Sequence, residues 1–469
     1  MKGMTLRAMT EAVNGIYHGN GEDYDKEITA ITIDSRKVAE GGLFIAIKGE
    51  RSDGHDFIGQ CFEKGAACVI SEKKLPDEGH SYIQVKSSLQ ALKDLALLYR
   101  NNLDVKVVGI TGSVGKTSTK ETISSVLSEK YRVLKTLGNF NNEIGLPLTV
   151  FRLTEDDEVA VLEMGISDFG EMDRLSKIAQ PDICVITNIG FCHLENLGTR
   201  DGILKAKTEI FNHMNPDGIV IVNGDDDKLS TISQVHGKRP LVFGISNKDG
   251  VYADNIKSLG LDGTSFTIHG IKTSDNYSTF DLTVPVPGHH MVYNAMAAAL
   301  VGSVLGLSSI EIERGVKNLK TIAGRNNIIK ENGFTIIDDC YNANPVSMKA
   351  SLDVLDTAIG RKVAILGSMF ELGENEKQMH YDVGMYLGTK DIDVLITAGD
   401  LAAQIAAGTR AYIDTNYNAH GCEVHDFETR DDMLKCIGQI LKKGDNILIK
   451  ASHGMEFGKV VEAVKIINV

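Results

Sequence analysis

One segment restricts the possible folds of this chain more than any other: residues 107–117 read Val-Val-Gly-Ile-Thr-Gly-Ser-Val-Gly-Lys-Thr. A run of strand-forming residues leads into a glycine-rich turn, and a helical pattern follows. Backbone N–H groups of such a turn surround phosphate oxygens, and the N-terminus of the helix adds a favourable field. The segment therefore predicts a strand, a phosphate-binding loop and a helix.

The loop departs at one position from the strict G-x-x-x-x-G-K-[ST] pattern, because residue 110 is Ile rather than Gly. The remaining T-G-x-x-G-K-T still predicts a nucleoside triphosphate site, with Lys116 at the β- and γ-phosphates and the Thr117 hydroxyl on magnesium. The alternative is a glycine turn before an ordinary helix, with a solvated lysine. The strand before the loop and the helix after it favour the triphosphate site.

Buried-type strands alternate with helical patterns beyond the loop, which is the order of a parallel, doubly wound sheet. The strands expected in this part of the chain are 105–111, 159–164, 183–187 and 219–222. Alternating polar and apolar residues over 251–285 predict an antiparallel extension, and a long helix is expected over 290–305. We therefore expect a central P-loop-type domain built on a mostly parallel sheet.

A further α/β unit is predicted on each side of this one. The first part of the chain contains short apolar runs, glycine-rich turns and an amphipathic stretch over 89–99. In the last part, strands again alternate with helical intervals, as in a Rossmann-like domain. The strand candidates there are 335–337, 363–366, 394–397 and 447–449. The expected fold class is α/β with three domains, which are 1–103, 104–322 and 323–469.

Charge and cysteine content exclude several classes of protein. The 469 residues include 49 basic and 63 acidic ones, and the net charge of −14 argues against a general binder of nucleic acid or membrane surfaces. Local positive groups and helix N-termini still allow an anionic substrate. No segment approaches the roughly 18 to 20 apolar residues that span a bilayer. The seven cysteines are scattered without zinc-ligand spacing, so we expect reduced thiols in a cytosolic protein.

Three segments after the phosphate loop carry residues suited to a metal ion. Glu163 ends a predicted strand, and a carboxylate in that place commonly ligates the magnesium of a bound nucleotide. His193 follows the next strand, and Lys205 and Lys207 lie in a predicted helix. Considered singly, Glu163 is equally well a capping or salt-bridged residue, His193 a structural histidine and the two lysines surface residues. The residue types alone leave these roles open.

Motifs spread over nearly the whole chain resemble those of the Mur ligase family. Besides the phosphate loop they are residues 34–36, 54–57, 138–148, 163–165, 186–195, 206–209, 287–295, 338–345 and 366–373. Two strings, Y-N-A-N-P at 341–345 and G-S-M-F-E-L-G at 367–373, resemble the family member that joins D-alanyl-D-alanine to UDP-N-acetylmuramoyl-tripeptide. The D-N-P-R string often found in the preceding ligase of the pathway is absent.

The resemblance implies an ATP-dependent ligase. The carboxylate of the UDP-linked tripeptide would attack the γ-phosphate of ATP, giving an acyl phosphate and ADP, and the amine of D-alanyl-D-alanine would then displace phosphate. The implied partners are these two substrates, ATP and two Mg²⁺ ions, with Lys207 carbamylated so that it offers oxygen ligands to a hard cation. The protein would act as a monomer, with no nucleic acid bound and no membrane insertion.

The resemblance also assigns residues to the nucleotide and its ions. The phosphate loop would be formed by Thr111, Gly112, Ser113, Val114, Gly115, Lys116 and Thr117. Thr117 and Glu163 would hold one magnesium ion. A second ion would be held by Glu163, His193 and the carbamate of Lys207.

Other positions are assigned to the rest of ATP and to the substrates. Asn294 would contact the adenine, Arg325 the γ-phosphate and Asp339 the ribose, with Asp338 an alternative for the last role. Substrate contacts are implied at Ser35, Arg36, Asn139, Asn141, Asn142, Asn342 and His380. Asparagines beside glycine are also typical of turns, and Asn342 and His380 are equally suited to a structural polar role.

Two departures from the family pattern bear on these assignments. Met291 stands where asparagine is frequent, and His453 where arginine is frequent. The alternatives are the preceding Mur ligase, which adds the third amino acid, and folylpolyglutamate synthase, in which the D-S-R and G-H-D-F motifs of the first domain would be missing. A non-catalytic regulatory protein on the same fold and a simple kinase are further alternatives.

Overall fold

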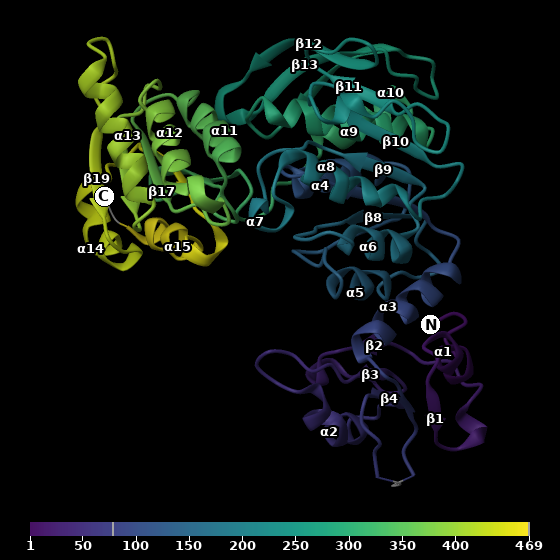
Figure 1. Ribbon diagram of the computed structural model, residues 1–469. Helices are drawn as coiled ribbons and strands as arrows, with labels where there is room; N and C mark the ends of the chain where they lie inside the picture. Colours follow the sequence, from purple (N-terminus) through teal and green to yellow (C-terminus); the bar gives the residue numbers. More distant parts are fainter. Residues whose placement is uncertain (77–78, 468–469) are drawn as a thin grey trace.

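The computed structural model describes residues 1–76 and 79–467, and within these ranges the strands form three sheets (Figure 1). The expected α/β class with three units is confirmed. We call them the N-terminal unit (β1 to β5), the central unit (β6 to β14) and the C-terminal unit (β15 to β20). The first and last units lie at separate ends of the central one (Figure 1). The expected limits after residues 103 and 322 stay predictions.

The N-terminal unit is built on short strands. Its sheet has the order β1 (Ile16–His18), β5 (Tyr82–Gln84), β4 (Cys68–Ser71), β3 (Leu43–Ile45) and β2 (Ile31–Thr32). β1 is antiparallel to its neighbour and the other pairs are parallel. The helices are α1 (Leu6–Ala12), α2 (Ile58–Glu63) and α3 (Ser88–Asn101). Leu92 and Leu95 of α3 belong to the same buried cluster as Val107 of the central sheet, so this helix joins the two units.

The central sheet is mostly parallel, as the sequence predicts. Its order is β14 (Thr279–Val284), β13 (Thr264–His269), β12 (Val251–Ser258), β11 (Leu241–Gly244), β10 (Ile219–Asn223), β9 (Ile183–Ile186), β6 (Lys106–Thr111), β8 (Val159–Glu163) and β7 (Val133–Lys135). β12, β13 and β14 pair in antiparallel fashion, which confirms the expected extension over 251–285. The other pairs are parallel.

Helices cover both faces of the central sheet, because its strands are apolar on both sides. One face packs against α4 (Lys116–Leu127), α9 (His290–Val304) and α10 (Ser309–Lys317). The other packs against α5 (Gly145–Val150), α6 (Glu171–Ala179) and α8 (Arg200–Thr208), and the short α7 (Leu194–Leu197) precedes α8. Adjacent residues of β6 therefore belong to different cores, Val107 to one and Val108 to the other.

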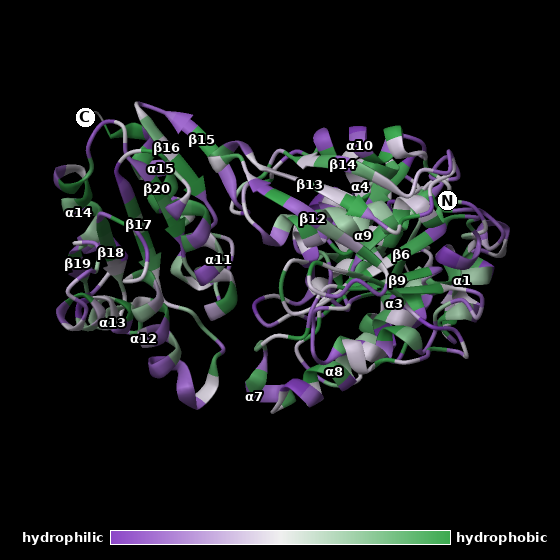
Figure 2. Cartoon of the chain, turned by 90° about the horizontal axis from the view of Figure 1, so that it is seen from above, coloured by the Kyte–Doolittle hydropathy of each residue, from purple (hydrophilic) through white to green (hydrophobic). Residues whose placement is uncertain are grey.

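The C-terminal unit is a second parallel sheet with one antiparallel edge strand. Its order is β15 (Asn327–Glu331), β16 (Phe334–Asp338), β20 (Asn446–Lys450), β17 (Lys362–Gly367), β18 (Val394–Ala398) and β19 (Glu423–Phe427). One face carries α11 (Pro345–Asp356), α12 (Glu376–Leu387) and α13 (Ala402–Thr415), and the other α14 (Arg430–Ile440) and α15 (Gly458–Ile466). The inner strands β17, β18 and β20 are predominantly hydrophobic (Figure 2). The expected Rossmann-like unit is therefore present.

Each of the seven cysteines has a free thiol, in agreement with the expectation of unpaired cysteines. None of the helices in the two described ranges combines the length and the apolar character that a membrane span requires.

Candidate active site

A cavity of about 680 Å³ lies between the central and C-terminal units. Its central wall is formed by the phosphate loop, the start of α4 and the ends of β8, β9 and β10, where an open parallel sheet places its ligands. Its C-terminal wall is formed by residues near the ends of β16 and β20 and by α11. The predicted site residues that line it are Ser113, Val114, Gly115, Lys116, Thr117, Asn141, Asn142, Glu163, His193, Asn294, Arg325, Asp339 and Asn342.

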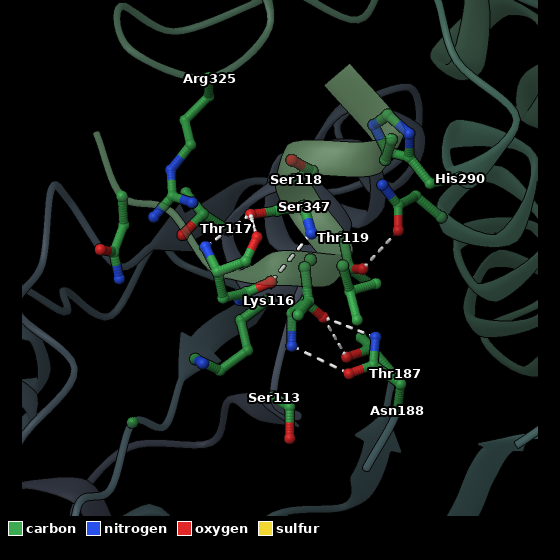
Figure 3. Close-up of a pocket in the computed structure, with 18 of the residues that line it drawn as sticks. Ser113, Lys116, Thr117, Ser118, Thr119, Thr187, Asn188, His290, Arg325 and Ser347 are labelled. Atoms are coloured by element: carbon green, nitrogen blue, oxygen red, sulfur yellow. Dashed lines mark hydrogen bonds between the residues drawn. The ribbon is translucent and has the colours of Figure 1, made fainter. Parts of the chain in front are cut away.

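The phosphate loop joins β6 to α4 and needs glycine at two positions. Gly112 has φ +150°, and a Cβ there would come within 1.9 Å of the Thr187 hydroxyl oxygen. Gly115 precedes α4 with a left-handed backbone (φ +83°). Lys116 Nζ donates to the Gly112 carbonyl oxygen (2.8 Å), so the lysine lies over its own loop. Figure 3 shows Lys116 and Thr117 at the start of α4, with the Arg325 side chain extending toward them.

Two residues at the end of β9 fix the far side of the loop. The Thr187 hydroxyl donates to the Val114 carbonyl oxygen (2.7 Å), and Asn188 both accepts from the Val114 N–H (2.9 Å) and donates to its carbonyl oxygen (3.0 Å). Thr187 and Asn188 lie in the family motif at 186–195, but the sequence alone assigned neither of them a role. Their position directly after a buried strand, beside the loop, was the signal that could have identified them.

Glu163 ends β8 and is held on two sides. Its backbone N–H donates to the Thr136 hydroxyl (3.0 Å), and Asn141 Nδ2 donates to its Oε1 (2.8 Å). Its other oxygen, Oε2, is buried and has no hydrogen-bond partner. A buried carboxylate oxygen without a partner is unfavourable unless a ligand satisfies it. Glu163 therefore presents one free oxygen beside the phosphate loop.

Lys207 and His193 interact electrostatically with each other and with Lys116, but their surroundings differ. Lys207, in α8, is fully buried behind the cavity lining, and burial together with the charge of Lys116 lowers its pKa to about 7. His193 lines the cavity, and burial lowers its pKa below the usual value for histidine. His193 Nδ1 lies 3.0 Å from Oε2 of Glu371, which the C-terminal unit contributes. The alternative of a surface position for Lys207 is thus excluded.

The wall formed by α9 carries a second set of polar contacts. Asn294 Oδ1 accepts from the Thr119 hydroxyl (2.9 Å), and its Nδ2 faces the Met291 sulfur (3.2 Å). The Tyr293 hydroxyl donates to Asp225 (2.8 Å), and Asp225 also accepts from backbone N–H groups of the 245–247 turn. Asp225 follows β10, so a carboxylate after a buried strand was again the signal, and sequence reasoning missed it.

The chain matches three family models along its length. They are described as "Mur ligase family, catalytic domain" over residues 27–100, "Mur ligase middle domain" over 110–302 and "Mur ligase, glutamate ligase domain" over 324–453. The UDP-N-acetylmuramoyl-tripeptide--D-alanyl-D-alanine ligase of Bacillus subtilis (strain 168) is 40% identical over 463 residues, which cover 98% of this chain and 97% of that protein. The chain belongs to the Mur ligase family.

Solved structures of Mur ligases agree with this. A crystal structure of MurF from Acinetobacter baumannii has a TM-score of 0.87 at 32% identity, covering 98% of each chain. MurF ligase from Thermotoga maritima, solved in complex with ADP, has a TM-score of 0.80 at 31% identity and covers 93% of this chain and 97% of that one. A folylpolyglutamate synthase of Mycobacterium tuberculosis, at 15% identity and a TM-score of 0.62, shares the fold.

On the C-terminal wall of this Mur ligase, the two candidates for the ribose contact, Asp338 and Asp339, occupy different positions. Asp338 is buried and accepts from the Gly324 N–H (2.7 Å), whereas Asp339 lines the cavity. The Asp339 carboxylate accepts from Ser351 (2.6 Å), from the Asn326 N–H (3.1 Å) and from Lys450 (2.5 Å). The Asp339 carboxylate is therefore already hydrogen-bonded to three groups of the protein.

Arg325 is held on the same wall by an aromatic ring. Its guanidinium lies 4.0 Å from the centroid of Tyr341, and the His453 ring lies 5.4 Å from the same centroid. His453 therefore lies beside the aromatic ring that holds Arg325.

Several predicted residues stay outside the cavity. Thr111 and Gly112 belong to the phosphate loop but do not line the cavity. Ser35 and Arg36 lie in the N-terminal unit, where the Arg36 side chain forms two hydrogen bonds to Asp34 (2.8 and 2.9 Å). Asn139 is exposed, and its carbonyl oxygen accepts from the Asn141 N–H (2.7 Å).

Two of the asparagines that line the cavity are partly engaged in local turns. Asn142 Oδ1 accepts from two backbone N–H groups at the start of α5, and Asn342 Oδ1 accepts from the Ala343 N–H (2.9 Å). These contacts agree with the alternatives that the sequence left open, a turn role for Asn142 and a structural polar role for Asn342.

His380 does not reach the cavity. It is fully buried in α12, its Nε2 accepts from the Met369 N–H (2.8 Å), and its Nδ1 donates to the Glu376 carbonyl oxygen (2.6 Å). Burial lowers its pKa, so the ring is neutral. Both ring nitrogens hold the 367–370 loop against α12, which supports the structural role that the sequence left open, and the substrate contact stays a prediction.

The side chains present fit a triphosphate with its divalent ion. Glu163 Oε2 is an oxygen without a partner, Thr117 is a hydroxyl at the start of α4, and the Gly112 cradle excludes any side chain. Nowhere in residues 1–76 and 79–467 do three or more His, Cys, Asp or Glu side chains gather in a group that could hold a metal ion by themselves. Oxygen ligands from the nucleotide would complete the coordination, which is usual for magnesium.

Proposed function

We propose that this Mur ligase joins D-alanyl-D-alanine to UDP-N-acetylmuramoyl-tripeptide, converting ATP to ADP and phosphate. The observation that carries the chemistry is Glu163, which lines the cavity between the phosphate loop and Arg325 and whose buried Oε2 has no hydrogen-bond partner. The full-length similarity to the Bacillus subtilis ligase supports the choice of the two substrates.

The residues of the cavity suit phosphoryl transfer to a carboxylate. Two anions, the carboxylate and the triphosphate, repel each other as they approach, so positive groups are needed on both sides of the γ-phosphate. Lys116 lies on the central wall and Arg325 on the opposite one. Thr117 and Glu163 would hold a magnesium ion, which would supply further positive charge beside the triphosphate. The tripeptide carboxylate then displaces ADP from the γ-phosphorus, and the acyl phosphate results.

The second step forms the peptide bond. The amine of D-alanyl-D-alanine attacks the activated carbonyl carbon, the C–N bond forms, and the C–O bond to phosphate breaks as the amine loses a proton. An acyl phosphate reacts with water, so the cavity must exclude it during this step. The C-terminal wall carries Arg325 and Asp339, so its approach to the central wall would both complete the site and displace water.

Lys207 is proposed to be carbamylated. Its amine would attack the carbon of carbon dioxide, a C–N bond would form, and one proton would leave to solvent. The reaction needs the neutral amine, and burial lowers the pKa of Lys207 to about 7, far from the usual 10.5. The carbamate would join Glu163 and His193 around a second magnesium ion. As an anion it would also relieve the repulsion between Lys207 and Lys116.

The carbamate has a direct test. Protein labelled with ¹³C-bicarbonate should give a carbamate carbon signal that grows as the pH rises through about 7, since the neutral fraction of Lys207 grows in that direction. Lys207→Arg should lack the signal. A wild-type spectrum without it at alkaline pH would contradict the assignment.

The proposed reaction is tested with purified protein, ATP and Mg²⁺. Phosphate should be released only when both UDP-N-acetylmuramoyl-tripeptide and D-alanyl-D-alanine are present, and the pentapeptide product should appear by mass spectrometry. Lysine or diaminopimelate with the UDP-linked dipeptide tests the preceding ligase, and folate with glutamate tests the folylpolyglutamate synthase. Turnover with either alternative set and none with the first would overturn the proposal.

We also propose that the enzyme works in the cytosol as a monomer. Free thiols at all seven cysteines are typical of a reducing compartment. Sedimentation of the purified protein at micromolar concentration tests whether it is a monomer.

A further inference from the structure

Lys120 is a fully buried lysine that none of the steps above uses. It lies in α4, one turn beyond Lys116, and its side chain is 1% exposed. Burying an ammonium group is costly unless its charge and its donors are all paired. The contacts of this residue therefore indicate what it does.

The Lys120 ammonium group contacts one carbonyl oxygen and two carboxylates. Nζ donates to the Thr136 carbonyl oxygen (2.8 Å) and lies 3.0 Å from Oε1 of Glu121. The same Nζ lies 3.8 Å from Oε2 of Glu163, too far for a hydrogen bond but close enough for a strong charge interaction at a buried position. Lys120 thus compensates the charge of Glu163 without occupying its free oxygen.

Thr136 links the two residues a second time. Its carbonyl oxygen accepts from Lys120, and its hydroxyl accepts from the Glu163 N–H (3.0 Å). With Asn141 on Oε1, the carboxylate is fixed at its backbone and at one oxygen, and Oε2 alone is left for a ligand. Glu121 pairs in turn with Lys135, so two cations and two carboxylates form a neutral set below the cavity floor.

We propose that Lys120 is a positioning residue for the divalent ion of the nucleotide. It orients Glu163 so that Oε2 stays available to the cation, while its own hydrogen bonds go to other groups. Without Lys120 the buried carboxylate turns toward another cation, such as Lys116, and no longer presents that oxygen. This inference rests on the proposed function, because it assumes that Glu163 ligates the magnesium ion of a nucleotide.

The test measures ADP binding by calorimetry in MgCl₂ and in EDTA, with no peptide substrate present. Lys120→Met should weaken ADP binding in Mg²⁺ about tenfold or more and leave binding in EDTA unchanged, because partners that orient a metal ligand typically contribute that much to metal affinity. Lys130→Met, which also removes a lysine bonded to a carbonyl oxygen, is the matched control and should bind as the wild type does. An equal loss in MgCl₂ and EDTA, or unchanged or tighter binding in MgCl₂, would overturn the proposal.

A second comparison separates positioning from a general structural effect. In a Glu163→Gln background, Lys120→Met should cause no further loss of Mg²⁺-dependent binding, because it acts through Glu163; losses that add up would contradict this. If Lys120→Met fails to fold, Lys120→Met/Glu121→Gln removes one cation and one anion together and is compared with Glu121→Gln. In Mg²⁺ the double variant should bind ADP about tenfold more weakly than Glu121→Gln does. Equal binding of ADP by the double variant and by Glu121→Gln would overturn the proposal.

The same data distinguish this inference from the proposed function. A wild-type protein whose ADP binding does not depend on Mg²⁺ would contradict the proposed function itself. A Mg²⁺-dependent wild type with an equally dependent Lys120→Met variant would contradict the role of Lys120 alone.

Discussion

The two walls of the cavity differ in how their polar groups are satisfied. On the central wall, Glu163 Oε2 has no partner, and Lys116 bonds only to a carbonyl oxygen of its own loop. On the C-terminal wall, the Asp339 carboxylate accepts from Ser351, Lys450 and the Asn326 N–H. An incoming nucleotide gains new hydrogen bonds on the first wall and must compete with protein partners on the second.

This difference suggests a division of work. Polar groups that are fixed in place but have no hydrogen-bond partner stabilise a transition state most, because the protein does not have to reorganise before they interact with it. Groups already paired contribute through a change of partners, which suits a wall that moves. We therefore expect substitutions of Lys116 and Glu163 on the central wall to reduce turnover strongly, and substitutions around Asp339 on the C-terminal wall to act mainly on affinity and stability.

The largest effect is expected for Lys116→Ala. Removing the cation at the phosphates should lower kcat/KM for ADP formation about 10³-fold, as loss of a transition-state donor does. ADP formation is measured with both peptide substrates present, and the unfolding temperature should stay within a degree or so of the wild type. Unchanged ADP formation would remove the basis of the proposed function.

The central wall could be predicted from the sequence because its signals are local. The runs around Val107 and Val161 are buried on both faces of the sheet and therefore read as strands, and the loop between β6 and α4 carries its own glycines. Glu163 is the last residue of β8. The burial of Lys207 had no such local signal, since α8 has a lysine two residues earlier that is more exposed.

Contacts between distant segments could not be predicted from one sequence. Lys120 is buried because α4 packs over β7 and β8, and its partner Thr136 lies 16 residues away. The family resemblance implied a substrate contact at His380, with a structural polar role as the alternative, but the orientation of the ring depends on how α12 packs on the 367–370 loop. Tertiary packing determines both positions, and neither spacing nor residue type encodes it.

A substitution on the C-terminal wall should show a smaller and different effect. Lys450→Met removes a buried cation from Asp339, so the free energy of unfolding should fall by about 3 kcal/mol. The KM for ATP should rise about tenfold, with a smaller change in kcat, since Asp339 is left misplaced. Denaturant unfolding measures the change in stability, and initial rates at varied ATP concentration measure KM and kcat. A loss of kcat like that of Lys116→Ala would show that the walls do not differ as argued.

The N-terminal unit offers a third region against which to compare the two walls. Arg36 is exposed and pairs with Asp34, which lowers the pKa of that carboxyl to about 2. Arg36→Ala should raise the KM for the UDP-linked substrate about fivefold and leave the KM for ATP and the unfolding temperature unchanged. Arg7→Ala, which removes a similar exposed pair with Asp25, is the control and should change none of them. A rise in the KM for ATP would mean that Arg36 acts on the cavity instead.

The smallest effect on turnover is expected for His380→Ala. Both ring nitrogens are bonded within the C-terminal unit, so the substitution should cost about 2 kcal/mol of unfolding free energy and lower kcat only about twofold. His380→Gln keeps an acceptor for the Met369 N–H and should recover part of the stability. If His380 instead contacted the dipeptide, the KM for D-alanyl-D-alanine would rise while stability stayed the same. That outcome would place a binding residue behind the C-terminal wall, and the wall would have to rearrange far more than its present hydrogen bonds indicate.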